Sequence, residues 1–282
     1  MNICIVGLGL LGGSFALGLR EVVDNCHIIG VDINKSHASK ALELGIADEL
    51  MTFREGVKKA DFIVLATPVD VLITQVPGAL DDIQDHAFVI DLGSTKELIC
   101  KTADAHPKRG QYIATHPIAG TENSGPEAAF ASLLKGKMMI ICDREKTDID
   151  SMEKLSTILT DMNMQLEYMS AEGHDRHIAY VSHLSHISSF ALGATVLGIE
   201  KNEKNIFIMA GSGFSSTVRL AKSSPAMWAP IFSQNRKNIS QALNAYIENL
   251  QKFKEILDDD NTEESFKYME ETNDIRRVLK GE

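Results

Sequence analysis

Short hydrophobic runs alternate with longer segments of helical periodicity over the first 168 residues. The runs are rich in β-branched residues and read NICIV, HIIGV, FIVLA, AFVID, YIAT, MMIIC and QLEYM. Between them, hydrophobic residues recur at helical spacing in ranges such as 35–44, 69–80 and 148–162. This alternation predicts a fold of the α/β class, in which a doubly wound, mostly parallel sheet carries helices on both faces.

The alternation of strand-like and helical segments ends near residue 170. One long helical pattern runs from 171 to about 198, and further helices are expected over 225–257 and 263–279, without a strand signal between them. The sequence therefore predicts two domains, an α/β domain over 1–168 and an all-α domain over 169–282.

Composition and charge narrow the possible function classes. The chain has 282 residues, of which 44% are hydrophobic, so it can bury a large core. No hydrophobic run approaches the roughly 20 residues of a membrane-spanning helix, and the start of the chain lacks the basic region of a secretory signal, so we expect a cytoplasmic protein without a membrane partner. A net charge of −11 argues against a nucleic acid partner. The four cysteines are widely separated and suit buried thiols better than disulfides or zinc.

A glycine-rich turn follows the first expected strand. In VGLGLLGGS, residues Gly7, Gly9 and Gly12 have the G-x-G-x-x-G spacing that lets a helix N-terminus meet a pyrophosphate. The next strand ends in Asp32, where an acid can bind an adenosine ribose, so the pattern predicts a Rossmann-type domain that binds NAD in preference to NADP, although Lys35 lies nearby. The alternative is that the glycines serve turn geometry alone. The cofactor-binding residues predicted from these strand ends are Gly7, Gly9, Leu10, Leu11, Gly12, Asp32, Thr67 and Pro68.

Two polar residues follow later strands and should therefore lie at the same edge of the sheet. Ser94 lies in DLGSTK and His116 in THPIAG. A histidine beside a nicotinamide, supported by a hydroxyl, can take the proton from an alcohol while the hydride leaves to the cofactor. The alternative interpretation is that His116 ends a strand and Ser94 caps the next helix.

The long helical pattern carries a second group of candidates. His183 and His186 share a helix face, and Asp175 lies three turns before His186 on nearly the same side. These residues could hold a metal, bind an organic anion, or simply be core histidines. Further on, Arg219 suits a carboxylate ligand or a surface ion pair, and Trp228 follows a proline.

Several motifs together resemble those of a known family. The segments GLGLLGGS, DLGSTK, THPIAGTENSG, EGHDRHIAYVSHLSH, GFSSTVRLA and SPAMW occur in this order and cover nearly the whole chain. They are similar to the prephenate dehydrogenase (TyrA) family, which also includes arogenate and cyclohexadienyl dehydrogenases. The SSTV segment before Arg219 departs from relatives, which often carry other polar and charged residues there.

The resemblance implies an activity, a site and an assembly. It implies NAD-dependent oxidation and decarboxylation of prephenate to 4-hydroxyphenylpyruvate in tyrosine biosynthesis, with His116 accepting the hydroxyl proton and Ser94 orienting the hydroxyl. It also implies an all-α domain that binds substrate and forms a homodimer. We expect Glu122 and Asp175 to pair with Arg219 or its neighbours at the mouth of the pocket. The substrate-binding residues that it implies are His183, His186, Arg219, Glu122, Asp175, Thr121 and Trp228.

Three other functions remain open from the sequence. A sibling enzyme would prefer arogenate, and a β-hydroxyacid or imine oxidoreductase would usually place a lysine or aspartate base in the helical half. A non-catalytic NAD-binding sensor would bind the cofactor without turnover.

Overall fold

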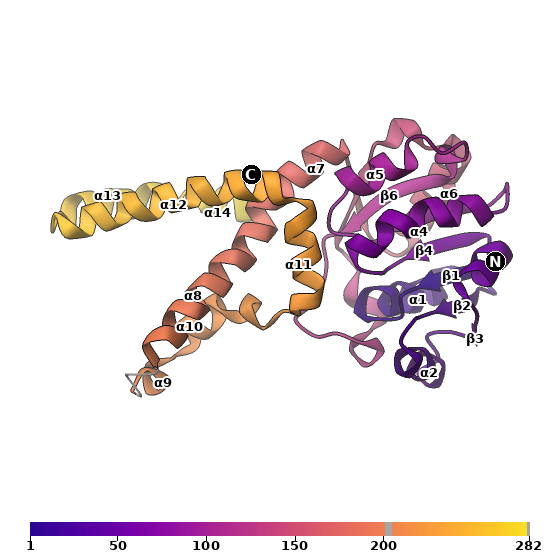
Figure 1. The fold of residues 1–282 in the computed structure, drawn as a ribbon, viewed down its shortest axis with the longest axis horizontal. Helices are drawn as coiled ribbons and strands as arrows, with labels where there is room; N and C mark the ends of the chain where they lie inside the picture. The colour runs from indigo at the N-terminus through magenta and orange to yellow at the C-terminus, as the bar shows by residue number, and fades with distance from the viewer. Residues whose placement is uncertain (201–204, 281–282) are drawn as a thin grey trace. The chain divides into compact units, whose positions relative to one another are not determined.

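A computed structural model describes residues 1–200 and 205–280 (Figure 1). Within them, one eight-stranded sheet has the order β3-β2-β1-β4-β5-β6-β7-β8. The seven expected strands are all present, and the sequence missed only β3, which has two residues. The strands are β1 Asn2–Val6, β2 His27–Val31, β3 Glu49–Leu50, β4 Phe62–Leu65, β5 Phe88–Asp91, β6 Tyr112–Pro117, β7 Met138–Cys142 and β8 Gln165–Met169.

The sheet is mostly parallel, as predicted, and the exception lies at one end. β7 runs antiparallel to β6, with Ala114 opposite Cys142, and β8 is parallel to β7. A parallel neighbour requires a crossover connection, which is usually a helix. The segment 118–137 contains only two single-turn 3-10 helices, so the chain turns back beside β6 instead.

Helices cover both faces of the sheet because successive side chains of each strand point to opposite faces. In β1, Ile3 and Ile5 join the core against α1, α2 and α6, whereas Cys4 and Val6 join the core against α3, α4 and α5. The helices of this half are α1 Leu10–Val22, α2 Lys35–Glu43, α3 Phe53–Lys59, α4 Val69–Asp82, α5 Glu97–Ala103 and α6 Ile149–Asp161.

The second half of the chain is helical, but each long predicted helix is broken. A π-helical turn at Ala179–His183 interrupts the pattern expected over 171–198, and Asn235 separates α11 from α12. The last expected helix divides near Asn273. The helices are α7 Ala171–Ile178, α8 Leu184–Glu200, α9 Ile206–Met209, α10 Ser212–Thr217, α11 Pro225–Gln234, α12 Arg236–Asp258, α13 Thr262–Thr272 and α14 Ile275–Lys280.

The chain divides into two compact units, one from Met1 to Arg236 and one that begins at Lys237. The first unit extends well beyond the sheet because α7 and α11 pack against it: Ala171, Trp228 and Ile231 belong to the same core as α4 and α5. The division after residue 168 stays a prediction about where the α/β pattern ends. Among the described residues, no helix is both long and hydrophobic enough to cross a membrane.

Candidate active site

The glycine turn brings β1 and α1 into close contact. Gly7 has a φ of +93°, and a Cβ there would lie 2.6 Å from the carbonyl oxygen of Ala66. A Cβ at Gly12 would lie 1.9 Å from the carbonyl oxygen of Gly7. Side chains are therefore excluded at both positions, which explains why the sequence has glycine there.

The start of α1 fits a phosphate group. Gly9 is the N-cap of α1 and offers no side-chain hydrogen bond to the first turn. A Cβ added to Gly9 would meet nothing within 4 Å, so there is open space beside the residue that precedes Leu10 and Leu11, the first two residues of the helix. Free N–H groups at the positive end of a helix dipole are suited to bind a pyrophosphate.

The remaining predicted cofactor residues lie around this turn. The Asp32 side chain lies at the end of β2, and its Oδ2 accepts a hydrogen bond from the backbone N–H of Leu8 at 2.8 Å. This bond ties the carboxylate to the glycine turn, where it can face a ribose. Thr67 and Pro68 follow β4 and begin α4, with Pro68 as its N-cap. The strand order reverses between β1 and β4, which is where such sheets bind their ligands.

Ser94 and His116 lie at the same edge of the sheet, as predicted from the strand pattern. Ser94 follows β5 and His116 is near the end of β6, and these strands are parallel neighbours, with Asp91 opposite Ala114. The hydroxyl of Ser94 makes no hydrogen bond within the described residues, and Lys96, not Ser94, is the N-cap of α5. Ser94 is therefore not used to cap the helix.

A buried ion pair holds these two strand ends together, and the sequence analysis did not predict it. The fully buried Nζ of Lys96 pairs with Asp91 and donates to the carbonyl oxygen of Thr115 at 2.7 Å. Asp91 also accepts from the hydroxyl of Tyr112 at 2.7 Å. The network connects the loop that carries Ser94 with the strand that carries His116. Charge complementarity within DLGSTK was the signal that could have suggested it.

His116 is 9% exposed and begins a hydrogen-bonded row of three side chains. Its Nδ1 lies 2.8 Å from Nε2 of His174, and Nδ1 of His174 lies 2.8 Å from Oδ1 of Asp175. We call this row the His116–His174–Asp175 chain. The Nε2 atom of His116 has no partner within the described residues, but it is not among their fully enclosed polar atoms. One nitrogen of His116 is therefore tied into the protein, and the other remains available.

Electrostatics keep the His116 ring neutral. Burial holds the pKa of His116 well below 6.5, and the neighbouring His174, Lys96 and His183 add to this lowering. A neutral imidazole at pH 7 can accept a proton, which is the property required of a general base.

His183 is fully buried and presents an unpaired N–H group. The amide nitrogen of Asn235 donates to the carbonyl oxygen of Asp175 at 2.6 Å and lies 3.2 Å from Nδ1 of His183. Since that nitrogen is a donor, Nδ1 of His183 accepts and its Nε2 carries the hydrogen. Burial lowers the pKa of His183 to about 4, which leaves the ring neutral. Its Nε2 has no hydrogen-bond partner within the described residues.

His186 and Trp228 complete this group. The two rings stack with centroids 3.5 Å apart, and Trp228 meets His183 edge-on at 5.9 Å. Nδ1 of His186 donates to the carbonyl oxygen of Ser182 at 3.0 Å, so a neutral His186 has an acceptor at Nε2. The buried Nε1 of Trp228 has no partner among the described residues. These contacts form within one chain.

One expectation for the pocket mouth agrees with the structure and one is wrong. Arg219 forms the expected ion pair with Glu122 at 3.3 Å. Glu122 follows Thr121 on an exposed loop. The expected pairing of Asp175 with Arg219 or its neighbours is wrong, because Asp175 is 2% exposed and accepts hydrogen bonds from the backbone of Lys96 and from His174. The Asp175 carboxylate instead accepts hydrogen bonds from backbone N–H groups at the start of α5.

No group of three or more metal-ligating side chains is close enough to hold a metal within the described residues. His174 and Asn235 were missed by the sequence analysis. His174 lies next to Asp175 in EGHDRH, and this adjacent pair of a histidine and an acid was the available signal. For Asn235 the sequence offered no signal, because its contacts connect distant segments.

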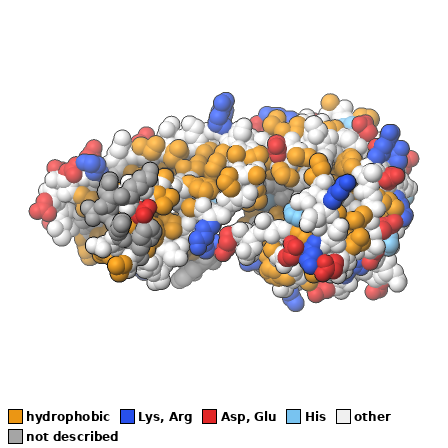
Figure 2. All heavy atoms as spheres, turned by 60° about the horizontal axis from the view of Figure 1, so that its bottom comes forward, with side chains coloured by type: hydrophobic (Ala, Val, Ile, Leu, Met, Phe, Trp, Pro, Cys, Tyr) orange, Lys and Arg blue, Asp and Glu red, His pale blue; other side chains and the backbone are white. Residues whose placement is uncertain are grey.

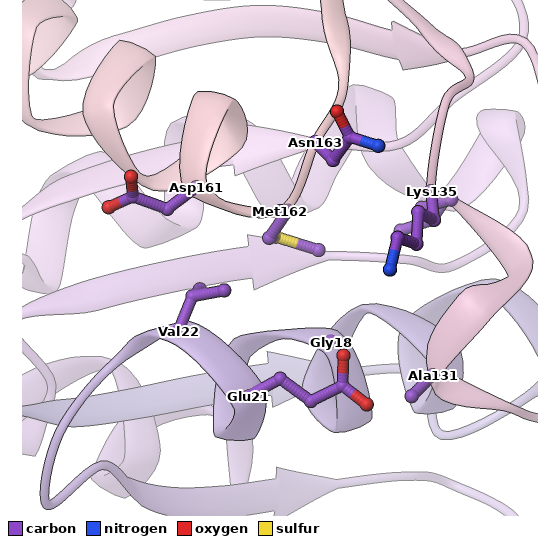
Figure 3. A pocket seen from close by; sticks show the side chains of 9 residues that line it. Gly18, Glu21, Val22, Ala131, Lys135, Asp161, Met162 and Asn163 are labelled. Atoms are coloured by element: carbon purple, nitrogen blue, oxygen red, sulfur yellow. The ribbon is translucent and has the colours of Figure 1, made fainter.

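Figure 3 shows a small cavity that is lined by other residues. Its volume is about 100 Å³, and its lining includes Glu21, Lys135 and Asp161. It adjoins Gly18 and Val22 in the last turns of α1, whereas the predicted phosphate site is at the first turn. The cavity is therefore not part of the candidate active site.

Two family profiles match the chain. The profile described as "Prephenate dehydrogenase, nucleotide-binding domain" matches residues 15–168, and "Prephenate dehydrogenase, dimerization domain" matches residues 170–271.

Individual relatives cover nearly the whole chain. A prephenate dehydrogenase of Bacillus subtilis is 32% identical over 99% of this chain and 76% of its own length. A cyclohexadienyl dehydrogenase of Zymomonas mobilis is 26% identical over 99% of this chain and 96% of its own. A crystal structure of prephenate dehydrogenase from Aquifex aeolicus, in complex with hydroxyphenyl propionate and NAD+, has a TM-score of 0.90 and 35% identity, covering 99% of this chain and 98% of that one. The chain therefore belongs to the prephenate dehydrogenase family.

Proposed function

We propose that this protein is an NAD-dependent prephenate dehydrogenase. It oxidises the ring alcohol of prephenate, and loss of the ring carboxylate then gives 4-hydroxyphenylpyruvate. Membership of the family and the likeness to a structure that holds NAD+ and hydroxyphenyl propionate support this proposal. The start of α1 and the position of Asp32 are consistent with NAD as the cofactor.

The observation that carries the proposal is the available nitrogen of His116. Its ring is neutral, Nδ1 is held by His174, and Nε2 has no partner within the described residues. His116 accepts the proton of the substrate hydroxyl at Nε2, and the free hydroxyl of Ser94 orients the same group. When bound, NAD would supply the acceptor for the hydride of the ring carbon. Since the product gains an aromatic ring, the protein needs to supply only position and a base.

Unpaired donors are suited to the substrate's anionic groups. Prephenate carries two carboxylates and a keto oxygen, which require cations or N–H groups. The Nε2–H of His183 and Nε1–H of Trp228 are buried without partners in the described chain, and such groups are costly unless a ligand satisfies them. Arg219, at the exposed edge, binds a carboxylate and exchanges Glu122 for it. His186, whose Nε2 is an acceptor, holds Trp228 by stacking and is available to a hydroxyl or a water molecule.

The helical half is proposed to form a homodimer. Leu197 of α8 and Ile208 and Met209 of α9 are exposed large hydrophobic residues. Hydrophobic side chains also gather on the face seen in Figure 2. Exposed hydrophobic surface of this kind marks interfaces. The name of the profile that matches 170–271, a dimerization domain, supports the same arrangement.

The test uses four reactions of the purified protein: prephenate or arogenate, each with NAD or NADP. We expect reduced nicotinamide to form fastest, by kcat/KM, with prephenate and NAD. A higher kcat/KM for arogenate would identify the sibling enzyme. NAD binding without turnover of either substrate would identify a cofactor sensor and would refute the proposal.

A further inference from the structure

In the hydrogen bonds that link His116, His174 and Asp175, the contacts of Asp175 determine which atom donates and which accepts. Oδ1 of Asp175 accepts from the backbone N–H of Lys96 at 2.7 Å, and Oδ2 accepts from that of Glu97 at 3.0 Å. Oδ1 also lies 2.8 Å from Nδ1 of His174. Backbone N–H groups can only donate, so the carboxylate is held as an acceptor. The hydrogen between Asp175 and His174 therefore lies on Nδ1 of His174.

The position of the hydrogen on His174 determines which nitrogen of His116 carries a hydrogen. A neutral imidazole with its hydrogen on Nδ1 has an acceptor at Nε2. Burial lowers the pKa of His174, although Asp175 opposes the shift, so the ring stays neutral near pH 7. Nε2 of His174 lies 2.8 Å from Nδ1 of His116, so the hydrogen of that bond belongs to His116. The other nitrogen of His116, Nε2, then carries a lone pair.

We propose that His174, oriented by Asp175, is a positioning residue that fixes the tautomer of His116 with its hydrogen on Nδ1. This tautomer directs the basic nitrogen, Nε2, away from the protein and toward a bound alcohol. The identity of that alcohol rests on the proposed function. The tautomer itself depends only on the three side chains and on the backbone N–H groups that donate to Asp175, and it is present before any substrate binds.

The arrangement has a consequence for the proton transfer. As the O–H bond of the substrate breaks, its proton forms an N–H bond at Nε2 of His116 and the electron pair left on oxygen forms the C=O bond. The hydride on the carbinol carbon would pass to NAD when NAD is bound. The positive charge formed on His116 faces the acceptor nitrogen of His174, with the carboxylate of Asp175 behind it. A histidine held in the opposite tautomer would present an N–H to the substrate and could not accept the proton. In serine proteases, a wrong tautomer of the catalytic histidine lowers kcat by about 10⁴-fold.

His174 is a better position for a test than Asp175, because Asp175 also closes the start of α5. His174→Phe keeps an aromatic ring but removes both nitrogens. His174→Gln provides an amide oxygen that can accept from Nδ1 of His116 while its NH₂ group faces Asp175. His177 is exposed on the same helix, three residues further along, so His177→Phe and His177→Gln are matched controls.

The first measurement is the tautomer, read from the ¹⁵N shifts of the ring nitrogens in histidine-labelled protein without ligands. The His116 signals are assigned by their loss in His116→Asn. We expect a protonated Nδ1 and an unprotonated Nε2 in the unmodified protein, in His174→Gln and in both controls. In His174→Phe, hydrogen should appear on Nε2. A proton on Nε2 of His116 in the unmodified protein overturns the proposal without reference to any variant.

The second measurement is turnover. We expect His174→Phe to lower kcat about 10²- to 10⁴-fold with KM for NAD unchanged, and His174→Gln to stay within about tenfold of the unmodified protein. Equal loss in the two variants would indicate a merely structural role and overturn the proposal. If the unmodified protein turns over none of the proposed substrates, the proposed function fails, but the tautomer measurement still decides the role of His174.

Discussion

Replacing Arg219 by alanine distinguishes its contribution to substrate binding from its contribution to the stability of the fold. The Arg219 side chain is 52% exposed and, within the described residues, makes a single ion pair of 3.3 Å with Glu122, whose side chain is 38% exposed. Exposed pairs contribute about 0.2–1 kcal/mol, so Arg219→Ala should change the free energy of unfolding by no more than this. A hydrogen bond from the guanidinium to a substrate carboxylate contributes about 1.5–3 kcal/mol. Its loss corresponds to an increase in KM for prephenate of roughly 10- to 150-fold.

The assay measures initial rates of reduced-nicotinamide formation at saturating NAD with prephenate varied, together with urea unfolding. Lys222→Ala is the matched control, because Lys222 is an exposed cation on the same 3-10 turn, Arg219–Lys222. We expect the control to leave KM unchanged and Arg219→Ala to raise KM with little effect on kcat. An unchanged KM in Arg219→Ala would refute the placement of Arg219 in the anion site. So would a rise of the same size in Lys222→Ala.

Three further predictions concern the buried ion pair, the base and the glycine turn. Lys96→Met leaves the carboxylate of Asp91 buried without a cation and should lower the free energy of unfolding by about 3–5 kcal/mol, measured by urea unfolding. Lys101→Met, which breaks an exposed pair on the same helix, should cost far less, and equal losses would contradict the account. Because burial holds the pKa of His116 well below 6.5, kcat/KM should fall only as the pH drops below 6.5; a midpoint at or above 6.5 would be inconsistent with this shift. Gly12→Ala places a Cβ 1.9 Å from a carbonyl oxygen, so the turn must shift, and calorimetry should show NAD binding weakened by at least about tenfold. Unchanged NAD affinity would argue against the pyrophosphate site.

Much of the α/β half could be predicted from local pattern, because the buried strands are continuous hydrophobic runs and the glycine spacing has a steric cause. The direction of β7 could not, since it depends on how the segment 118–137 turns back without an α-helix. The breaks in the long helices were also missed. The π-helical turn at Ala179–His183 contains no glycine or proline that would have indicated a break in the helix.

The candidate site, too, could be predicted from the sequence only in part. Ser94 and His116 could be placed together because the ends of neighbouring parallel strands meet at one edge. The partners of His116 lie far along the chain: His174 is 58 residues away, and Asp175 reaches the backbone of Lys96 across 79 residues. Helical periodicity relates residues of one helix only, so it grouped Asp175 with His183 and His186 and gave no indication of its role at the start of α5.

The role of His116 as the base of an NAD-dependent dehydrogenation can be measured through the kcat of His116→Asn with prephenate. We expect a decrease of about 100-fold or more with the affinity for NAD retained, because the variant lacks the general base. A variant that turns over prephenate at the rate of the unmodified protein would contradict this role.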